Sequence, residues 1–136
     1  MFQVTQDTCS FSVTMTTELT NVDKCIEQLK QFLKTTNQQH TFFHVALLAR
    51  EALNNAMVHG NRFQSEKKVF FHVCGEEDTI ILQIEDQGPG FDWKKHLDFK
   101  SRVEAESGRG QEIFRLLARK ITYNDCGNIL TLEYEG

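Results

Sequence analysis

The stretch EALNNAMVHGN, residues 51–61, closes with Gly-Asn, a pair that predicts the C-terminal end of a helix. Within it Glu51, Asn55 and His59 stand four residues apart and therefore lie on one face of that helix. The apolar residues between them follow the spacing of a core-facing side. The helix thus carries a stripe of carboxylate, amide and imidazole groups, which is either an ordinary solvated face or one wall of a site.

The segments before this stretch predict two further elements. Apolar residues at helical spacing extend the helix back to about His40 and predict another helix over residues 21–33. Alternating apolar and polar residues predict a strand over residues 10–18.

The segments after the stretch predict four strands and one helix. KVFFHVCG and TIILQIED, joined by EED, are typical of a hairpin. A helix is expected to begin near Gly110, and two closing strands, ITYND and NILTLEY, follow it. The order βααββ–loop–αββ predicts an α+β fold: a two-layer α/β sandwich with a mixed, mostly antiparallel sheet covered by helices on one face.

Composition and charge indicate a single globular domain spanning residues 1–136. A net charge of -4 gives no electrostatic footprint for nucleic acid, so a protein partner or a small ligand is the better expectation. The chain has no apolar run fit for a signal peptide or a membrane span, which predicts a cytoplasmic protein. Its four cysteines form no CxxC pair, so reduced thiols are expected and a zinc site is not.

The segment IEDQGPGF, residues 84–91, places a carboxylate at the end of a strand. Asp86 leads directly into a loop in which Gly88 and Gly90 carry no side chain and allow close approach of a ligand. An ionised carboxylate only accepts hydrogen bonds, so Asp86 could bind an amino group such as that of adenine. An ordinary tight turn with Asp as the turn former explains the same residues.

The segment SGRGQEIF, residues 107–114, places two glycines before the predicted last helix. Free N–H groups at a helix N-terminus favour an anion, although a flexible hinge explains a Gly-x-Gly equally well. It is neither a Rossmann fingerprint nor a Walker A loop. On the opening helix, Asn55 offers an oxygen suited to Mg²⁺, and Glu51 could deprotonate a nucleophile nearby. His59 is interpreted as a helix-end or packing residue.

Together these motifs resemble a known family. E-x-x-x-N-A-x-x-H-G, D-x-G-x-G-F and G-R-G-x-x-I resemble, in this order, the N, G1 and G2 boxes of the GHKL (Bergerat-fold) ATPases. The resemblance spans essentially the whole chain. The brevity of the sequence narrows the resemblance to the anti-sigma-factor serine/threonine kinase branch, whose members consist of the ATP-binding domain alone.

The resemblance implies a role for each matching residue. Glu51 matches the general base, Asn55 the Mg²⁺ ligand, and Asp86 the carboxylate that binds the adenine amino group of ATP. Residues 93–107 match the ATP lid. The remaining matches are Gly88 and Gly90, which shape the pocket, and Gly108, Arg109 and Gly110 of the phosphate loop, while Lys94, Lys95, Lys100 and Arg102 of the lid either meet phosphate or belong to a solvated loop.

The implied function is a switch. Members of this branch sequester a sigma factor and use Mg-ATP to phosphorylate a Ser or Thr of a STAS-domain anti-anti-sigma protein, commonly as homodimers. Gln111, where many relatives have Leu or Met, and a short lid bear on turnover more than on nucleotide binding. One alternative is a catalytically weak, nucleotide-dependent protein-binding module that regulates a non-sigma target. The detached catalytic domain of a histidine kinase fits less well, because the residues before the opening helix already form a strand and a helix.

Overall fold

A computed structural model of the protein describes residues 1–90 and 105–136, and residues 105–110 by their backbone only. Six strands form one sheet in the order β1-β2-β3-β4-β6-β5, and every neighbouring pair is antiparallel. The expected α+β fold is confirmed, but among the described strands the sheet is wholly antiparallel rather than mixed. The strands are β1 (Phe2–Gln6), β2 (Ser10–Thr16), β3 (Lys68–Glu76), β4 (Thr79–Asp86), β5 (Lys120–Tyr123) and β6 (Ile129–Glu135).

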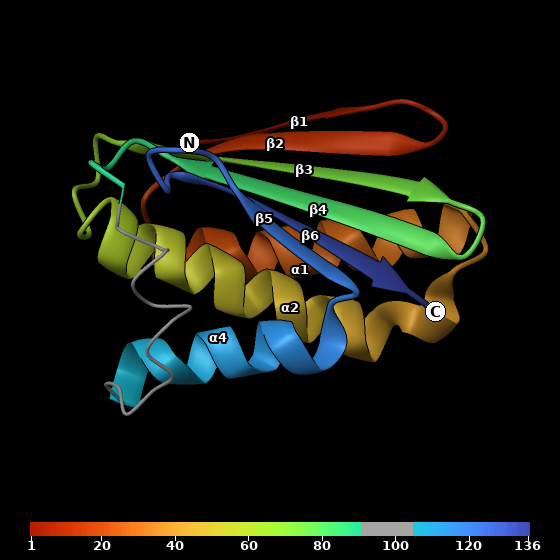
Figure 1. The fold of residues 1–136 in the computed structure, drawn as a ribbon. Coiled ribbons are helices and arrows are strands. Elements are labelled where there is room, and N and C mark those ends of the chain that lie inside the picture. Colours follow the sequence, from red (N-terminus) through yellow and green to blue (C-terminus); the bar gives the residue numbers. More distant parts are fainter. Residues whose placement is uncertain (91–104) are drawn as a thin grey trace.

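The helices cover one face of the sheet, as the sequence predicted (Figure 1). The helix α2 (Phe42–Asn55) packs between α1 (Leu19–Thr35) and α4 (Ala105–Leu117). A 3₁₀ turn, η1 (Gln39–Thr41), precedes α2, and a π-helical segment, η2 (Ala56–Gly60), follows it. Within residues 1–90 and 105–136, no helix combines the length and the apolar character needed to cross a membrane.

The core lies between the sheet and these helices. Alternation along β2 buries Phe11, Val13 and Met15 on the helix-facing side, and β3 and β4 repeat the pattern. The Phe11 ring lies 5.0 Å from the Phe32 ring of α1 and 5.9 Å from the Phe71 ring of β3. Aromatic contacts at such distances add to the free energy of burial. They fix α1 against the centre of the sheet.

Two elements differ from the sequence prediction. The edge strand β1 was not predicted, because FQVTQ is short and its ladder with β2 is set by backbone pairing rather than by a marked alternation of its own. The helix α4 begins at Ala105 and not near Gly110, so Gly108 and Gly110 lie inside it. Each internal glycine costs a helix about 1 kcal/mol. Packing of Phe114, which is 0% exposed, opposes that cost.

Candidate functional site

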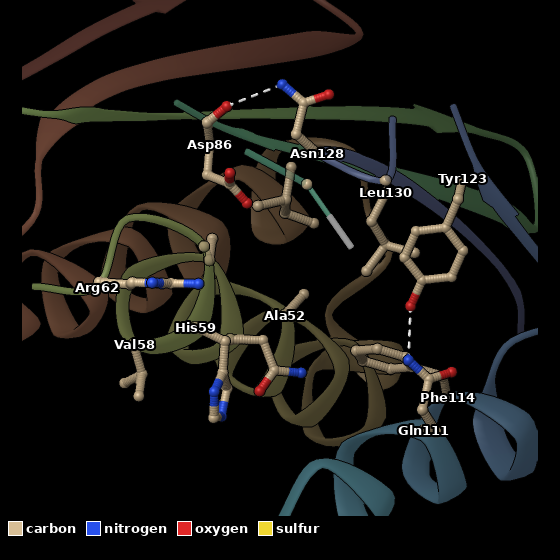
Figure 2. Close-up of a pocket in the computed structure, with 16 residues that line it drawn as sticks. Ala52, Val58, His59, Arg62, Asp86, Gln111, Phe114, Tyr123, Asn128 and Leu130 are labelled. Atoms are coloured by element: carbon tan, nitrogen blue, oxygen red, sulfur yellow. Dashed lines mark hydrogen bonds between the residues drawn. The ribbon is translucent and has the colours of Figure 1, made fainter. Parts of the chain in front are cut away.

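A cavity of about 490 Å³ opens between the helical layer and one end of the sheet (Figure 2). Its walls come from α2, η2, the end of β4, the second half of α4 and the turn between β5 and β6. Much of the lining is apolar, with a few polar side chains among it, as in most small-molecule sites. The lining residues are Ala52, Asn55, Ala56, Val58, His59, Gly60, Arg62, Ile84, Asp86, Gly90, Gln111, Phe114, Tyr123, Gly127, Asn128 and Leu130.

Asp86, the last residue of β4, is the carboxylate of this cavity. Its side chain is 9% exposed, and its Oδ1 accepts a hydrogen bond of 2.9 Å from the Gly88 N–H. Oδ2 accepts none within the described part of the chain. Burial raises the pKa of Asp86, the neighbouring Glu85 adds to the rise, and the Gly88 N–H and Lys67 oppose it. The carboxylate is therefore costly to keep ionised, and a ligand that donates to Oδ2 would lower that cost.

Three glycines let the backbone close around Asp86. A Cβ on Gly60 would lie 2.3 Å from Asp86 Oδ2, and one on Gly88 would lie 2.0 Å from the Gly60 carbonyl oxygen. Gly90 has φ +83°, and its Cβ would lie 1.9 Å from the Cys126 carbonyl oxygen. A side chain on Gly88 or Gly90 would displace the facing backbone, whereas one on Gly60 would displace the Asp86 carboxylate. The predicted shaping role of Gly88 and Gly90 thus has a steric basis, although of these two only Gly90 lines the cavity.

Asn61 fixes the corner at which Asp86 lies, a role that the sequence did not reveal. Its buried amide donates to Thr17 Oγ1 at 2.9 Å and to the Lys68 carbonyl at 3.0 Å. Its Oδ1 accepts from the Gln87 N–H at 2.8 Å. One side chain therefore ties the end of η2 to the start of β3 and to the residue after Asp86. The sequence signal, an Asn after a helix-ending Gly, predicted only a stop.

Asn128 supports Asp86 from the opposite side and was also missed. It donates from Nδ2 to the Asp86 carbonyl at 3.1 Å, and its own carbonyl accepts from the Asp86 N–H at 3.0 Å (Figure 2). Asn124 Nδ2 in turn donates to Asn128 Oδ1 at 2.7 Å. Asn124 Oδ1 caps the turn by accepting from the N–H groups of residues 127–129. This Asx-type turn holds the end of β4 in place.

The polar stripe of the opening helix is only partly in the cavity. Asn55, the last residue of α2, lines it. Glu51 lies one turn earlier, is half-buried, and is not among the lining residues. His59 lies in the last turn of η2, so it is a helix-end residue as predicted, and it is exposed and lines the cavity rather than packing in the core. π-helical segments such as η2 occur frequently at functional sites.

The helix α4 closes the cavity on the side away from Asp86. Gln111 donates from Nε2 to the Tyr123 hydroxyl of β5 at 2.6 Å, and burial raises the pKa of that hydroxyl (Figure 2). Because α4 starts at Ala105, the backbone of Gly108, Arg109 and Gly110 is helical rather than a loop before a helix. Of the predicted lid, residues 93–104 lie outside the described residues, and with them Lys94, Lys95, Lys100 and Arg102.

The family model of the histidine kinase-like ATPase domain matches residues 15–134. The chain belongs to this family. No curated protein gave a significant match. Membership implies ATP binding and confirms the resemblance to the GHKL ATPases.

A site for ATP needs surfaces for the base and room for the phosphates. The cavity offers apolar surfaces on Ile84, Leu130 and Phe114, and a buried acceptor on Asp86. Among the residues that the structure describes, no group of three His, Cys, Asp or Glu side chains could hold a metal ion. Asn55 could hold Mg²⁺ only in part, which suits an ion that keeps water and phosphate oxygens as ligands.

Proposed function

We propose that the protein is an ATP-dependent serine/threonine kinase and that the cavity is its ATP site. The observation that supports this most is Asp86, a buried carboxylate with one oxygen held by the Gly88 N–H and the other without a donor among the described residues. A buried acceptor of this kind favours a ligand that brings an N–H donor. The amino group of adenine is such a donor, and the apolar walls suit the faces of the base.

Two residues of α2 would take part in transfer of the γ-phosphoryl group. Asn55, at the C-terminal end of the helix, would ligate a Mg²⁺ ion that neutralises charge on the phosphates. Glu51, one turn earlier, would accept the proton of a Ser or Thr hydroxyl as its oxygen bonds to the γ-phosphorus. The bond between the γ-phosphorus and the bridging oxygen then breaks, and ADP leaves. Positioning and electrostatic stabilisation supply most of the catalysis in such reactions.

The proposed setting is a partner switch in the cytoplasm. The acceptor would be a Ser or Thr of a STAS-domain anti-anti-sigma protein, and the sequestered target a sigma factor or another regulatory protein, with the kinase as a homodimer. A phosphoryl group adds about two negative charges at neutral pH. With a net charge of -4, the protein would repel a partner so modified. Phosphorylation would thereby release the antagonist.

The test compares phosphoryl transfer with ATP binding. Wild type, Glu51→Ala, Asp86→Asn and a control, Glu66→Ala on the exposed turn before β3, are incubated with γ-labelled Mg-ATP and candidate STAS proteins. We expect label on Ser or Thr with wild type and Glu66→Ala, none with Glu51→Ala although it still binds ATP, and weak ATP binding by Asp86→Asn. Wild type that binds no ATP would refute the proposal.

A second function is favoured by the position of Glu51 outside the cavity lining. If the carboxylate does not reach the γ-phosphate, the domain is a nucleotide-dependent protein-binding module that regulates its target without transfer. The same experiment separates the two. ATP binding with no transfer to any STAS protein, in wild type and Glu51→Ala alike, would support the binding module and reject the kinase.

A further inference from the structure

Arg62 places a cationic group at the cavity from a side that no motif indicated. It follows η2 by two residues, is exposed and lines the cavity. Its side chain extends from the turn after η2 toward the cavity (Figure 2). The backbone beneath it is held by the corner that Asn61 fixes. The guanidinium is therefore presented by an anchored turn next to the helix that carries Asn55.

The charge of Arg62 is not compensated within the described residues. Those residues form four ion pairs, and Arg62 belongs to none of them. Among the described residues that line the cavity it is the only permanent cation, and Asp86 is the only carboxylate. The cation that lowers the pKa of Asp86 is Lys67 rather than Arg62. The guanidinium thus remains available to a negatively charged group of a ligand.

The backbone at this position is strained. Arg62 has φ +52° and the next residue, Phe63, has φ +58°, both in the left-handed region. For residues with a Cβ this conformation costs roughly 1 kcal/mol or more each, and glycine would avoid the cost. Hydrogen bonds hold the turn in place. The Phe63 N–H donates to the Met57 carbonyl at 2.9 Å, and the Gln64 N–H donates to the Asn61 carbonyl at 3.0 Å. Strained backbone of this kind clusters at active sites, ligand-binding positions and switch regions.

We propose that Arg62 binds the phosphate chain of the nucleotide. A guanidinium is planar and always charged, and it donates two parallel hydrogen bonds to a phosphate. It would offset the repulsion between the net negative charge of the protein and an anionic ligand. The inference rests on the proposed function, because it takes the nucleotide to be the ligand of this cavity. Within that function it adds a phosphate-binding residue on the turn after η2.

The experiment measures affinity for ligands that differ only in phosphate. ATP, ADP, AMP and adenosine are titrated calorimetrically against wild type, Arg62→Gln and Arg62→Lys. We expect Arg62→Gln to lower ATP affinity by about 10- to 100-fold, the range for charge-assisted hydrogen bonds, and Arg62→Lys to lower it less. The loss should shrink as phosphates are removed and vanish for adenosine.

A second measurement separates binding from a structural role. Arg62→Gly removes the strain, so it should hold or raise the urea midpoint while ATP affinity falls. Phe63→Gly relieves the neighbouring strained residue, whose side chain does not line the cavity, and should leave ATP affinity unchanged.

Each contrary result has a distinct meaning. Wild type that binds no ATP would overturn the proposed function and this inference with it. If wild type binds ATP and Arg62→Gln binds it equally well, only the role of Arg62 is refuted. An equal loss of affinity for adenosine and ATP would overturn phosphate binding and assign Arg62 to the base. Parallel losses of stability and affinity in Arg62→Gly would show that the residue is merely structural.

Discussion

Gly60→Ala is a small change that should disable the site without unfolding the protein. The added Cβ would lie 2.3 Å from Asp86 Oδ2, whereas ordinary contact begins at 3.4 Å, so the carboxylate must retreat by about 1 Å. Asp86 is buried, and its Oδ1 is hydrogen-bonded to the Gly88 N–H. A shift of the carboxylate therefore moves Oδ2, the oxygen proposed to accept from the ligand. A displacement of that size takes a hydrogen bond to the adenine amino group out of its normal distance range.

The expected loss follows from the strength of such a bond. Hydrogen bonds to charged groups contribute about 1.5–3 kcal/mol, which corresponds to a loss of ATP affinity of about 10- to 100-fold. Stability should change little, because Gly60 is not in the left-handed region and alanine is favoured over glycine in helices by about 1 kcal/mol. Calorimetric titration with ATP and urea unfolding of the same variant measure the two quantities.

Two controls make the prediction refutable. Gly75→Ala creates a similar close approach, 2.5 Å to Gln38 Oε1, away from the cavity lining, and should keep wild-type ATP affinity. In an Asp86→Ala background, Gly60→Ala should cost no further affinity, because the two changes remove the same interaction. If Gly60→Ala binds ATP as tightly as wild type, or weakens binding equally in both backgrounds, Asp86 is not the group through which it acts.

Three further substitutions probe the cavity and the residues that brace it. Because burial raises the pKa of Asp86 above its unfolded value, the folded protein binds the extra proton between the two pKa values, and the free energy of unfolding falls as pH rises through that window. Asp86→Asn should abolish this fall, be more stable than wild type above the window and bind ATP more weakly. Urea unfolding from about pH 4 to about pH 8 measures the stability, and an equal fall in Asp86→Asn would contradict the prediction. Asn61→Ala loses three hydrogen bonds and should destabilise the protein by about 3 kcal/mol in urea, and a cost below about 1 kcal/mol would contradict its bracing role. Phe114→Ala, which empties a fully buried position in the cavity wall, should cost about 3–5 kcal/mol of stability and weaken ATP binding, with exposed Leu116→Ala as a near-neutral control.

The fold followed from periodicity wherever an element is long enough to show it. The buried residues of α2 recur at helical spacing, and those of β2, β3 and β4 alternate with more exposed ones. Both patterns are visible in the local sequence. The strand β1 gave no such signal, since five residues can pair through the backbone whatever their side chains. The start of α4 was misplaced because glycines weaken a helix without forbidding it, and tertiary packing decides the outcome.

Part of the cavity lining was predictable from local sequence patterns. Asp86 stands at a strand end, Asn55 in a helical stripe and Gly90 in a tight loop, and all three line the cavity. Asn61 was missed as a brace because its partner Thr17 is 44 residues away in the sequence. Arg62 was missed because the residues around it do not predict its left-handed backbone conformation.

The bracing by Asn61 couples local unfolding to ligand binding. One buried amide joins the turn before α1, the start of β3 and the residue after Asp86, so these segments should open together as one cooperative unit. A ligand that binds only the closed corner would slow amide hydrogen exchange throughout that unit, including residues far from any ligand atom. Binding to the carboxylate would then reduce local opening at the start of α1, on the other side of the Asn61 side chain.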